Sequence, residues 1–394
     1  MNKEKRRVPK LRFPGFTEDW EQRKLGEFVK IVSGDAPSTF ISGNCIYVKV
    51  DDLNYSDRIQ LSSSNLVNAN SKAHLVNQGA TIFPKRGAAI MTNKVRIMGK
   101  DGYLDTNMMA LIPEEIDKDF LFTFIQKTGL YKIADTSTIP QINNKHIEPY
   151  IIQVPSEKEQ AYIGVVFEKI DKIITLHQRK LEHLNLKKKA LLQKLFPKNG
   201  ERHPELRFPG FTDAWEQRKL SEVVTINPKT ELPDEFKYVD LESVVGTNLL
   251  GFKVIKKENA PSRAQRLASY GDVFYQTVRP YQRNNYLFEN VDKDVVFSTG
   301  YAQLRSKLDS YFLLTLVQND NFVKVVLDNC TGTSYPAING SELGKITVQI
   351  PSNEVEANQI GKVFRGIDKS ITLHQRKLEH LQLQKKALLQ QMFV

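Results

Sequence analysis

The sequence predicts an α+β protein made of two similar halves, each a mixed α/β domain followed by a long helix. Three observations support this fold class. A tryptophan-containing segment near the start of the chain recurs in the middle, and a segment with heptad spacing of apolar residues recurs as well. The regions between these repeats combine strand-like and helix-like patterns. We therefore expect two pseudo-symmetric halves that share one fold.

The first repeat is LRFPGFTEDWEQRKL, residues 11–25, which returns as LRFPGFTDAWEQRKL at residues 206–220. Thirteen of the fifteen positions are identical, and the repeat contains both tryptophans of the chain, Trp20 and Trp215. Its apolar side chains surround a Pro-Gly turn and are too few to form a core alone. We expect them to pack on their own domain or on a helix end. Docking of one partner at both repeats is the alternative.

The second repeat is ITLHQRKLEHLNLKKKALLQ, residues 174–193, which returns at 371–390 with two changes. From Ile163 and Ile360 onward, apolar residues follow the alternating spacing of four and three that is typical of a coiled coil. Each helix is expected to span roughly forty residues, about 55 to 60 Å. The predicted seam of the helix pair consists of Ile163, Phe167, Ile170, Ile174, Leu181, Leu184, Leu191, Ile360, Phe364, Ile367, Ile371, Leu378, Leu381 and Leu388.

Two such helices in one chain most simply pack on each other, and the return of the chain through a second domain favours an antiparallel pair. Histidine and lysine also occupy seam positions, at His177, His374, Lys188 and Lys385. One interpretation is a buried polar key that fixes the register. The other, which is favoured, is that they lie at a fraying edge or cover a third surface, with lysine extending its amine to water. At the helix starts, Ser156 with Glu159 and Asn353 with Glu356 resemble capping boxes.

The regions between the repeats barely resemble each other in sequence. Strand-like segments lie at residues 45–53, 79–84 and 94–99 of the first half and at 271–278 and 294–300 of the second. Each half also has an amphipathic helix candidate, at residues 117–133 and 310–327. The expected boundaries are a first domain at 1–150, a central helix at 151–197, a second domain at 198–348 and a C-terminal helix at 349–394.

Repeats that stay nearly identical inside one chain should bind the same partner or each other, whereas the divergent regions should bind different ligands. A duplication that drifted neutrally would have blurred both equally. Only the closing segments of the divergent regions are alike, TSTIPQIN followed by QVPS in the first half and TGTSYPAIN followed by QIPS in the second. The organisation thus predicts two related domains with different ligands.

The formal net charge of +11 favours a polyanionic partner, most often nucleic acid. Residues 25–150 contain 13 basic and 13 acidic side chains, and residues 220–348 contain 14 and 15. The surplus therefore lies in the repeats and the tails, and net charge alone does not locate a binding site.

The two cysteines, Cys45 and Cys330, form no pairing framework, so neither a disulfide scaffold nor a zinc site is expected, and the composition fits a reducing cytoplasm. His177 and His183 stand on different helix faces and predict no metal site. No apolar run approaches the roughly 18 residues that a membrane span requires. We expect a cytoplasmic protein with no membrane contact.

This combination of repeats resembles the DNA-specificity subunit of type I restriction-modification enzymes. The two LRFPGF…WEQRKL openings, the PQIN and PAIN closings followed by QVPS and QIPS, and the ITLHQRKLEHL helices carry the resemblance, which covers essentially the whole chain. It implies that each divergent domain is a target-recognition domain that reads one half of a bipartite, asymmetric DNA site, while the helices set the gap. It also implies assembly with two methyltransferase subunits, and with two restriction-translocase subunits in the complete enzyme.

Two polar segments are the candidate DNA contacts. Residues 81–100 hold five basic side chains and no acid, and residues 276–286 combine arginine, glutamine, asparagine and tyrosine without an acid. Arginine can bind guanine with two hydrogen bonds and asparagine or glutamine can bind adenine, whereas an exposed hairpin with solvated charges is the alternative. The candidates are Lys85, Arg86, Thr92, Asn93, Lys94, Arg96, Gln276, Arg279, Tyr281, Gln282, Arg283, Asn284 and Asn285.

Alignment on Gly79 and Gly271 places Arg86 and Arg279 at nearly equivalent positions. The stretches rich in serine and threonine before Pro140 and Pro336 add further candidates, which could equally be turn residues. These further candidates are Gln141, Asn143, Tyr335 and Asn339.

No catalytic motif is recognisable, so we expect a chain that is not itself an enzyme. The phosphate-binding loop of ATP-driven motors is absent, and Asn227-Pro228-Lys229 departs at its third position from the N-P-P-[FY] signature of adenine methyltransferases. PDEFK at residues 233–237 resembles a nuclease motif only by chance, because its acids are adjacent. The resemblance implies S-adenosylmethionine, ATP and Mg²⁺ for the partner subunits, and no cofactor for this chain.

Two other functions are consistent with the same residues. A stand-alone architectural or regulatory DNA-binding protein would use the same domains without a methyltransferase. A scaffold that binds only protein would use the near-neutral divergent domains as adaptors. Steep salt dependence of duplex binding distinguishes the scaffold from the other two, and co-purification with a methyltransferase distinguishes those two from each other.

Overall fold

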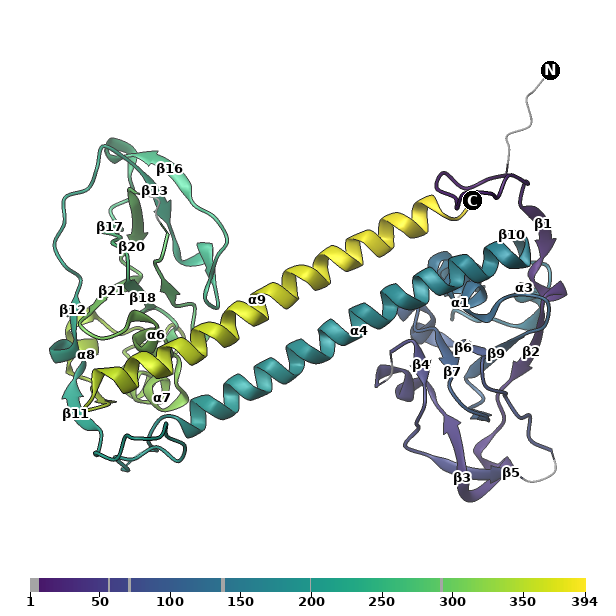
Figure 1. Cartoon of the computed structure of the whole chain (residues 1–394), viewed down its shortest axis with the longest axis horizontal. Helices are drawn as coiled ribbons and strands as arrows, with labels where there is room; N and C mark the ends of the chain where they lie inside the picture. Colours follow the sequence, from purple (N-terminus) through teal and green to yellow (C-terminus); the bar gives the residue numbers. More distant parts are fainter. Residues whose placement is uncertain (1–6, 56, 70–71, 136–138, 199, 291–292) are drawn as a thin grey trace. The chain divides into compact units, whose positions relative to one another are not determined.

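The computed structural model describes residues 7–55, 57–69, 72–135, 139–198, 200–290 and 293–394. The chain divides into two compact units, which we call unit 1 (residues 1–179 and 375–394) and unit 2 (residues 180–374). Two long helices, α4 (Glu157–Lys194) and α9 (Glu354–Gln391), each contribute residues to both units (Figure 1). At 38 residues, each helix is about 57 Å long.

Unit 1 contains a five-stranded sheet, a three-stranded sheet and a two-stranded sheet. The five-stranded sheet has the order β2 (Val29–Ser33), β9 (Met108–Pro113), β6 (Thr81–Pro84), β7 (Arg96–Met98) and β4 (Ile59–Gln60). The other two sheets are β5 (Leu66–Ala69), β3 (Phe40–Val48) and β8 (Gly102–Leu104), and β1 (Glu21–Lys24) with β10 (Ile151–Val154).

Unit 2 contains two four-stranded sheets and two strand pairs. One sheet has the order β12 (Val224–Ile226), β21 (Tyr301–Ser306), β18 (Asp272–Gln276) and β19 (Tyr286–Leu287). The other has the order β16 (Lys253–Lys256), β13 (Glu235–Val239), β20 (Val295–Ser298) and β17 (Ala264–Leu267). The pairs are β14 (Val244–Val245) with β15 (Asn248–Leu249) and β11 (Glu216–Lys219) with β22 (Thr347–Ile350).

The divergent regions share one topology despite their different sequences. The order β2-β9-β6-β7 of unit 1 matches β12-β21-β18-β19 of unit 2, and all of these neighbours are antiparallel. The order β5-β3-β8 matches β16-β13-β20, each with one antiparallel and one parallel pair. The strand-like segments of the sequence lie on β3, β6, β7, β18 and β20. The α+β class is thus confirmed.

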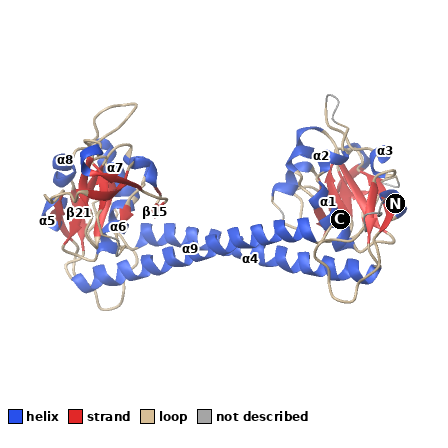
Figure 2. Ribbon diagram, turned by 90° about the horizontal axis from the view of Figure 1, so that it is seen from above, coloured by secondary structure: helices blue, strands red, loops and turns tan. Residues whose placement is uncertain are grey.

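The predicted amphipathic helices are each divided in two. Unit 1 has α1 (Lys118–Thr128) and α2 (Leu130–Ile133), separated by Gly129, and unit 2 has α6 (Ser310–Gln318) and α7 (Asp320–Asp328), separated by Asn319. Strands and helices pack against each other within each unit (Figure 2). The remaining short helices are α3 (Asn144–Ile147), α5 (Leu220–Val223), α8 (Gly340–Lys345), η1 (Leu25–Glu27), η2 (Pro37–Thr39), η3 (Val50–Asn54), η4 (Gly87–Thr92), η5 (Leu241–Ser243), η6 (Lys257–Asn259) and η7 (Pro280–Gln282).

A glycine in each long helix allows the start of α1 or α6 to approach closely. Asp117 caps α1, and a Cβ added to Gly164 of α4 would lie 2.6 Å from its carboxylate oxygen Oδ1. A Cβ added to Gly361 of α9 would clash in the same way with Asp309, the cap of α6. Both glycines therefore serve helix-to-helix contact inside a unit.

Each opening repeat packs into an aromatic cluster of its own unit. In unit 1 the ring of Trp20 lies 6.0 Å from Phe120 and 6.1 Å from Phe393, and Phe393 also contacts Phe167. The cluster joins the opening repeat, α1, the first half of α4 and the segment that follows α9. Its counterpart in unit 2 consists of Trp215, Phe312, Phe196 and Phe364. The structure thus favours packing of the repeats on their own unit.

The opening repeats are also bound to the long helices by buried ion pairs. Arg12 donates two hydrogen bonds, of 2.7 and 2.8 Å, to both carboxylate oxygens of Glu159, which is 1% exposed. Arg207 and Glu356 form the same arrangement in unit 2. The capping-box interpretation missed these partners, because the arginines lie about 150 residues away in the chain. At the start of α9, Asn353 does cap Val355.

Within each unit, the two long helices run antiparallel. Lys188 of α4 binds Asp368 of α9 at 2.6 Å in unit 2, and Lys385 of α9 binds Asp171 of α4 at 2.6 Å in unit 1. These lysines are partners of aspartate across the helix pair, so the register-key interpretation describes them and the favoured interpretation of a fraying edge was wrong. All fourteen predicted apolar seam residues are buried or half-buried. Those at the helix ends also belong to the core of their unit.

Candidate nucleic-acid interface

The polar segment of unit 1 forms a loop after β6 that pairs with the segment before α3. The amide of Ile142 donates to the carbonyl of Lys85, and the amide of Gly87 donates to the carbonyl of Pro140, both at 2.9 Å. These bonds align Arg86 opposite Gln141. The candidates after β6 and the candidates after Pro140 therefore meet at one edge of unit 1, although they lie about fifty residues apart in sequence. Of the stretch before Pro140, residues 136–138 lie outside the described residues.

Unit 2 has the same construction after β18. The amide of Ile338 donates to the carbonyl of Thr277 at 3.0 Å, and the amide of Arg279 donates to the carbonyl of Pro336 at 2.7 Å. Arg279 lies over the ring of Tyr335, with its guanidinium carbon 4.4 Å from the ring centre. This stacking restrains the guanidinium group beside the tyrosine ring.

The hydrogen-bond pattern confirms the alignment on Gly79 and Gly271, in which the two arginines are offset by one residue. Gly87 and Arg279 make equivalent bonds, so Arg86 corresponds to Val278, and Arg279 corresponds to a glycine. Gly87 has φ of +70°, and Arg279 adopts +54°, a left-handed conformation that is costly for residues other than glycine. Retention of strain of this kind is typical of functional loops, where it costs on the order of 1–3 kcal/mol.

The loops η4 and η7 both end in a second left-handed residue, Asn93 and Arg283. Both side chains are used inside their own unit. Asn93 donates to the carbonyl of Gln126 and accepts from the amide of Leu130, each at 2.9 Å. Arg283 binds the carbonyl of Gln318 and, at 2.6 Å, the carboxylate of Asp320. These hydrogen bonds stabilise the shape of the two loops.

Several other predicted contacts also have structural partners. In unit 1, Arg96 binds the carbonyls of Val95 and Leu53, and Lys94 binds the side chain of Asn54. In unit 2, the side chain of Gln276 bonds to Gln282 and to the amide of Asn284, the side chain of Asn285 bonds to the amide of Gln276, and the side chain of Asn284 bonds to the amide of Gly246.

Two candidates are helix caps, as the turn alternative expects. Asn143 forms a capping box with His146 at the start of α3, and Asn339 accepts from the amide of Glu342 at the start of α8. The hydroxyl of Thr92 donates to the carbonyl of Ala89 within η4. Among the described residues, the candidates whose side chains stay exposed or half-exposed without a hydrogen-bond partner of this kind are Arg86, Gln141, Arg279, Tyr281 and Tyr335.

Lys85 lies beneath Arg86 and is 9% exposed. Burial lowers the pKa of its amine, and the neighbouring charge of Arg86 lowers it further, while Asp105 and Asp35 oppose the shift. Burial thus destabilises the protonated amine of Lys85. A nearby phosphate would stabilise it, because the added negative charge favours the protonated form.

Sequence reasoning missed two exposed apolar side chains beside these loops. Met91 lies in η4 and is 59% exposed, and Ile139 directly precedes Pro140 and is 60% exposed. Apolar side chains can contact the methyl group of thymine or pack against unstacked bases. The sequence does not predict that these two side chains are exposed, because an isolated apolar residue in a loop is usually interpreted as a core residue.

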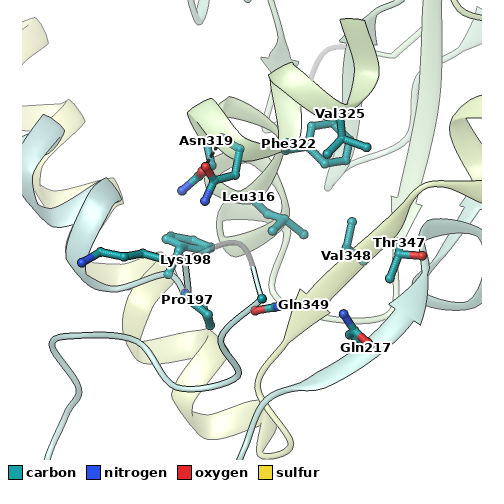
Figure 3. A pocket seen from close by; sticks show the side chains of 13 residues that line it. Pro197, Lys198, Gln217, Leu316, Asn319, Phe322, Val325, Thr347, Val348 and Gln349 are labelled. Atoms are coloured by element: carbon teal, nitrogen blue, oxygen red, sulfur yellow. Dashed lines mark hydrogen bonds between the residues drawn. The ribbon is translucent and has the colours of Figure 1, made fainter. Parts of the chain in front are cut away.

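A separate cavity of about 320 Å³ lies in unit 2 where the end of α4 meets α6, α7 and β22 (Figure 3). Leu316, Phe322 and Val348 give it apolar walls, and the side chain of Asn319 donates to the carbonyl of Leu192. None of the predicted DNA contacts lines this cavity.

Among the described residues, no group of three or more metal-binding side chains is present. The helices of the described part of the chain include none that is long and apolar enough to cross a membrane.

Comparison with known proteins agrees with this architecture. A family model described as "Type I restriction modification DNA specificity domain" matches twice, at residues 17–186 and 212–383. The MjaVIII specificity subunit of a type I restriction enzyme from Methanocaldococcus jannaschii is 24% identical, with 96% of this chain and 92% of the relative covered. The putative MjaX specificity subunit of the same organism is 21% identical, with 94% of this chain and 92% of the relative covered.

The fold is also similar to the crystal structure of a type I restriction-modification S subunit from M. genitalium, with a TM-score of 0.67, 14% identity and coverage of 98% of this chain and 99% of that one. Both halves of the chain match the family model, and the matched ranges include most of the chain. The chain therefore belongs to the type I restriction-modification DNA specificity family and is a DNA-binding specificity subunit.

Proposed function

We propose that the chain reads a bipartite, asymmetric DNA site, one half with the loops around η4 and the other half with the loops around η7. The observation that carries this proposal is the shared loop scaffold. In both units a short helix with left-handed ends pairs with the segment before α3 or α8, yet the presented side chains differ. Unit 1 presents Arg86 and Gln141, where unit 2 has Val278 and Ala337. Unit 2 presents Arg279 and Tyr335, where unit 1 has Gly87 and Ile139. A common scaffold with different side chains suits the reading of two different base sequences.

The long helices act in this proposal as the spacer between the two half-sites. Their length of about 57 Å exceeds the roughly 34 to 36 Å of one turn of duplex DNA, so the pair can hold two modules on the same face with overlap. The Lys188–Asp368 and Lys385–Asp171 pairs support a fixed register, because a slip of either helix would separate these charges.

Methylation and cleavage are assigned to partner subunits, which would supply S-adenosylmethionine, ATP and Mg²⁺. Two methyltransferase subunits would bind equivalent surfaces of the repeats. Leu176 and its repeat counterpart Leu373 are 64% and 67% exposed, and Leu186 and Leu383 are 68% and 66% exposed. Large apolar side chains that stay exposed at the same place in both repeats are suited to one partner that binds twice.

The proposal is tested in a host that expresses this chain with its cognate methyltransferase, by sequencing methylated adenines across the genome. We expect one target with two defined halves and a fixed gap. Arg86→Ala should relax the half read by unit 1, and Arg279→Ala should relax the other half. A chain whose two variants relax the same half would contradict the division of the site between the loops.

The spacer is tested with an insertion of four residues into both helices at matching positions. Each helix grows by about 6 Å, close to two base pairs at 3.4 Å each. We expect both half-sites to be retained and the preferred gap to lengthen. An unchanged gap would refute the spacer.

A further inference from the structure

The two long helices differ in charge where each faces its own recognition domain. After Ile174 and Ile371 they are nearly identical, but six residues earlier Glu168 of α4 stands where α9 has Arg365. Neither side chain is fully exposed. Arg365 contacts the divergent part of its unit through Glu289, and Glu168 lies within the electrostatic influence of Arg58 and Lys118. The substitution reverses the charge at this position, within a stretch of the two helices that also differs elsewhere, for example at Val165 and Lys362.

In unit 1 the recognition domain brings cations to this surface. Arg58, from the segment before β4, binds Asp171 of α4 at 2.5 Å and Asp119 of α1 at 2.7 Å, and it lies over the ring of Phe122. The Glu168 carboxylate also lies within the field of this cluster. Its pKa is lowered first by the hydrogen bond from Lys172 of the same helix, and further by the charges of Arg58 and Lys118.

In unit 2 the same contact has the opposite polarity. The recognition domain supplies the acid, because Glu289, which follows β19, binds Arg365 of α9 at 2.5 Å. Arg365 also lies over the ring of Tyr311, which replaces Asp119 at the start of the domain helix. The hydroxyl of Tyr311 donates to Asp368 at 2.7 Å, where unit 1 has the bond from Arg58 to Asp171.

We propose that Glu168 and Arg365 form a charge code that matches each recognition domain to its own helix and disfavours the other. Transfer of the first domain to α9 would bring Arg58 and Lys118 toward Arg365. Transfer of the second domain to α4 would bring Glu289 toward Glu168. In both cases a half-buried attraction becomes a repulsion, and a mispaired interface of this kind discriminates more strongly than the loss of an attraction alone.

The matching itself depends only on contacts inside each unit. Its consequence rests on the proposed function: the code fixes which half of the DNA target is read from which end of the helix pair. It also predicts that exchange of whole domains between the two positions requires exchange of one helix charge.

The first test is a charge-reversal cycle in the full chain, with Arg365→Glu, Glu289→Arg and the double variant. Because like charges replace an ion pair, each single variant should lower the thermal midpoint of unit 2 by about 2 to 4 °C. The double variant should recover most of the loss. Lys369→Glu, an exposed charge reversal on the same helix, is the matched control and should change the midpoint little. Failure of the double variant to recover would overturn the code in unit 2.

The second test is a chimera in which residues 25–150 replace residues 220–346, so that both positions carry the first domain. With Arg365 retained, its thermal midpoint should lie below that of the same chimera with Arg365→Glu. An equal or reversed order would overturn the proposal. Methylation by the chimera is read separately: an inverted repeat of the first half-site is expected from the proposed function. Its absence with the midpoints in the expected order would count against the proposed function and not against the code.

Discussion

Lys188 of α4 binds Asp368 of α9, and their repeat counterparts Lys385 and Asp171 form the same pair in the other unit at the same distance of 2.6 Å. One lysine and one aspartate of the repeat therefore produce two bridges across the helix pair. Each aspartate also binds its own domain, through Arg58 in unit 1 and through Tyr311 in unit 2. The bridges thus couple the helix register to the position of the divergent domains.

Replacement of one lysine of this pair should destabilise its own unit. Lys188→Met leaves the half-buried carboxylate of Asp368 with Tyr311 alone, a loss we expect to cost about 1 to 3 kcal/mol. In a Trp20→Phe background, urea unfolding followed by fluorescence of Trp215 reports unit 2. The neighbouring exposed lysine supplies the control, Lys187→Met, which should have little effect. Equal losses in the two variants would argue against the bridge.

The two helix glycines at the domain contact should not tolerate a methyl group. Gly164→Ala and Gly361→Ala would push the new Cβ into Asp117 and Asp309, which cap α1 and α6. We expect each to destabilise its unit by about 1 to 3 kcal/mol, measured by chemical unfolding.

Gly366, in the same helix α9, meets nothing within 4 Å of an added Cβ. Gly366→Ala should therefore stabilise the protein by up to about 1 kcal/mol, because alanine favours the helix. If all three substitutions stabilised the chain, close approach would not be the reason for the two glycines.

Replacement of Arg279 by glycine should lower the affinity for DNA without lowering the stability of the fold. Arg279→Gly suits the left-handed φ of +54° and should keep or raise the thermal midpoint, while it removes the side chain stacked on Tyr335. We expect affinity for the specific duplex to fall at least about tenfold, the equivalent of 1.4 kcal/mol, in a titration at fixed salt. Undiminished affinity would remove Arg279 from the interface.

Lys85 should cost stability in the free protein and contribute to DNA binding. Because folding lowers its pKa, the charged amine destabilises the fold below the lowered pKa, and stability recovers as pH rises from there toward the ordinary value of 10.5. Lys85→Met should therefore stabilise unit 1 at neutral pH and flatten its stability profile in this alkaline range. If the amine contacts phosphate, the slope of log affinity against log salt should decrease by about 0.9. A destabilised variant would contradict the burial cost.

The exposed leucines of the repeats should matter for assembly and not for folding. Leu176→Gln with Leu373→Gln removes large apolar side chains from a surface that is already solvated, so the thermal midpoint should stay within about 2 °C. The double variant should bind both copies of the methyltransferase more weakly. Each single variant should lose one methyltransferase copy more readily than the other. Unaltered two-copy assembly, determined by mass photometry, would exclude this surface.

The sequence of this chain was sufficient to predict its two-part organisation, the heptad helices and the α+β class. These features are local or repeated, and periodicity and near-identity are visible without knowledge of the fold. Most strand and helix segments of the divergent regions were predicted for the same reason. The division of the domain helices at Gly129 and Asn319 followed from turn geometry and was not foreseen.

The partners of the polar residues were decided only by the tertiary structure. The sequence predicts Asn93, Arg283 and Asn339 as DNA contacts, and the structure adds their hydrogen bonds within the loops and at the start of α8. The one-residue offset between Arg86 and Arg279 is visible in the alignment on Gly79 and Gly271, and the hydrogen bonds to Pro140 and Pro336 confirm it. A side chain of arginine or asparagine suits both roles chemically, and segments distant in the chain determine which role it takes.

The same division holds for the charges on the helices. The sequence alone shows that Glu168 is replaced by Arg365, but such a change on a helix surface is usually of no consequence. Its meaning arises because folding places Arg58 and Glu289 beside these positions, from segments about 75 to 110 residues away. Periodic patterns in the sequence determined the long helices and the two-part organisation. The contacts of each divergent domain with its helix were decided by the tertiary structure, because the charges that complement each other come from distant segments and meet only after folding.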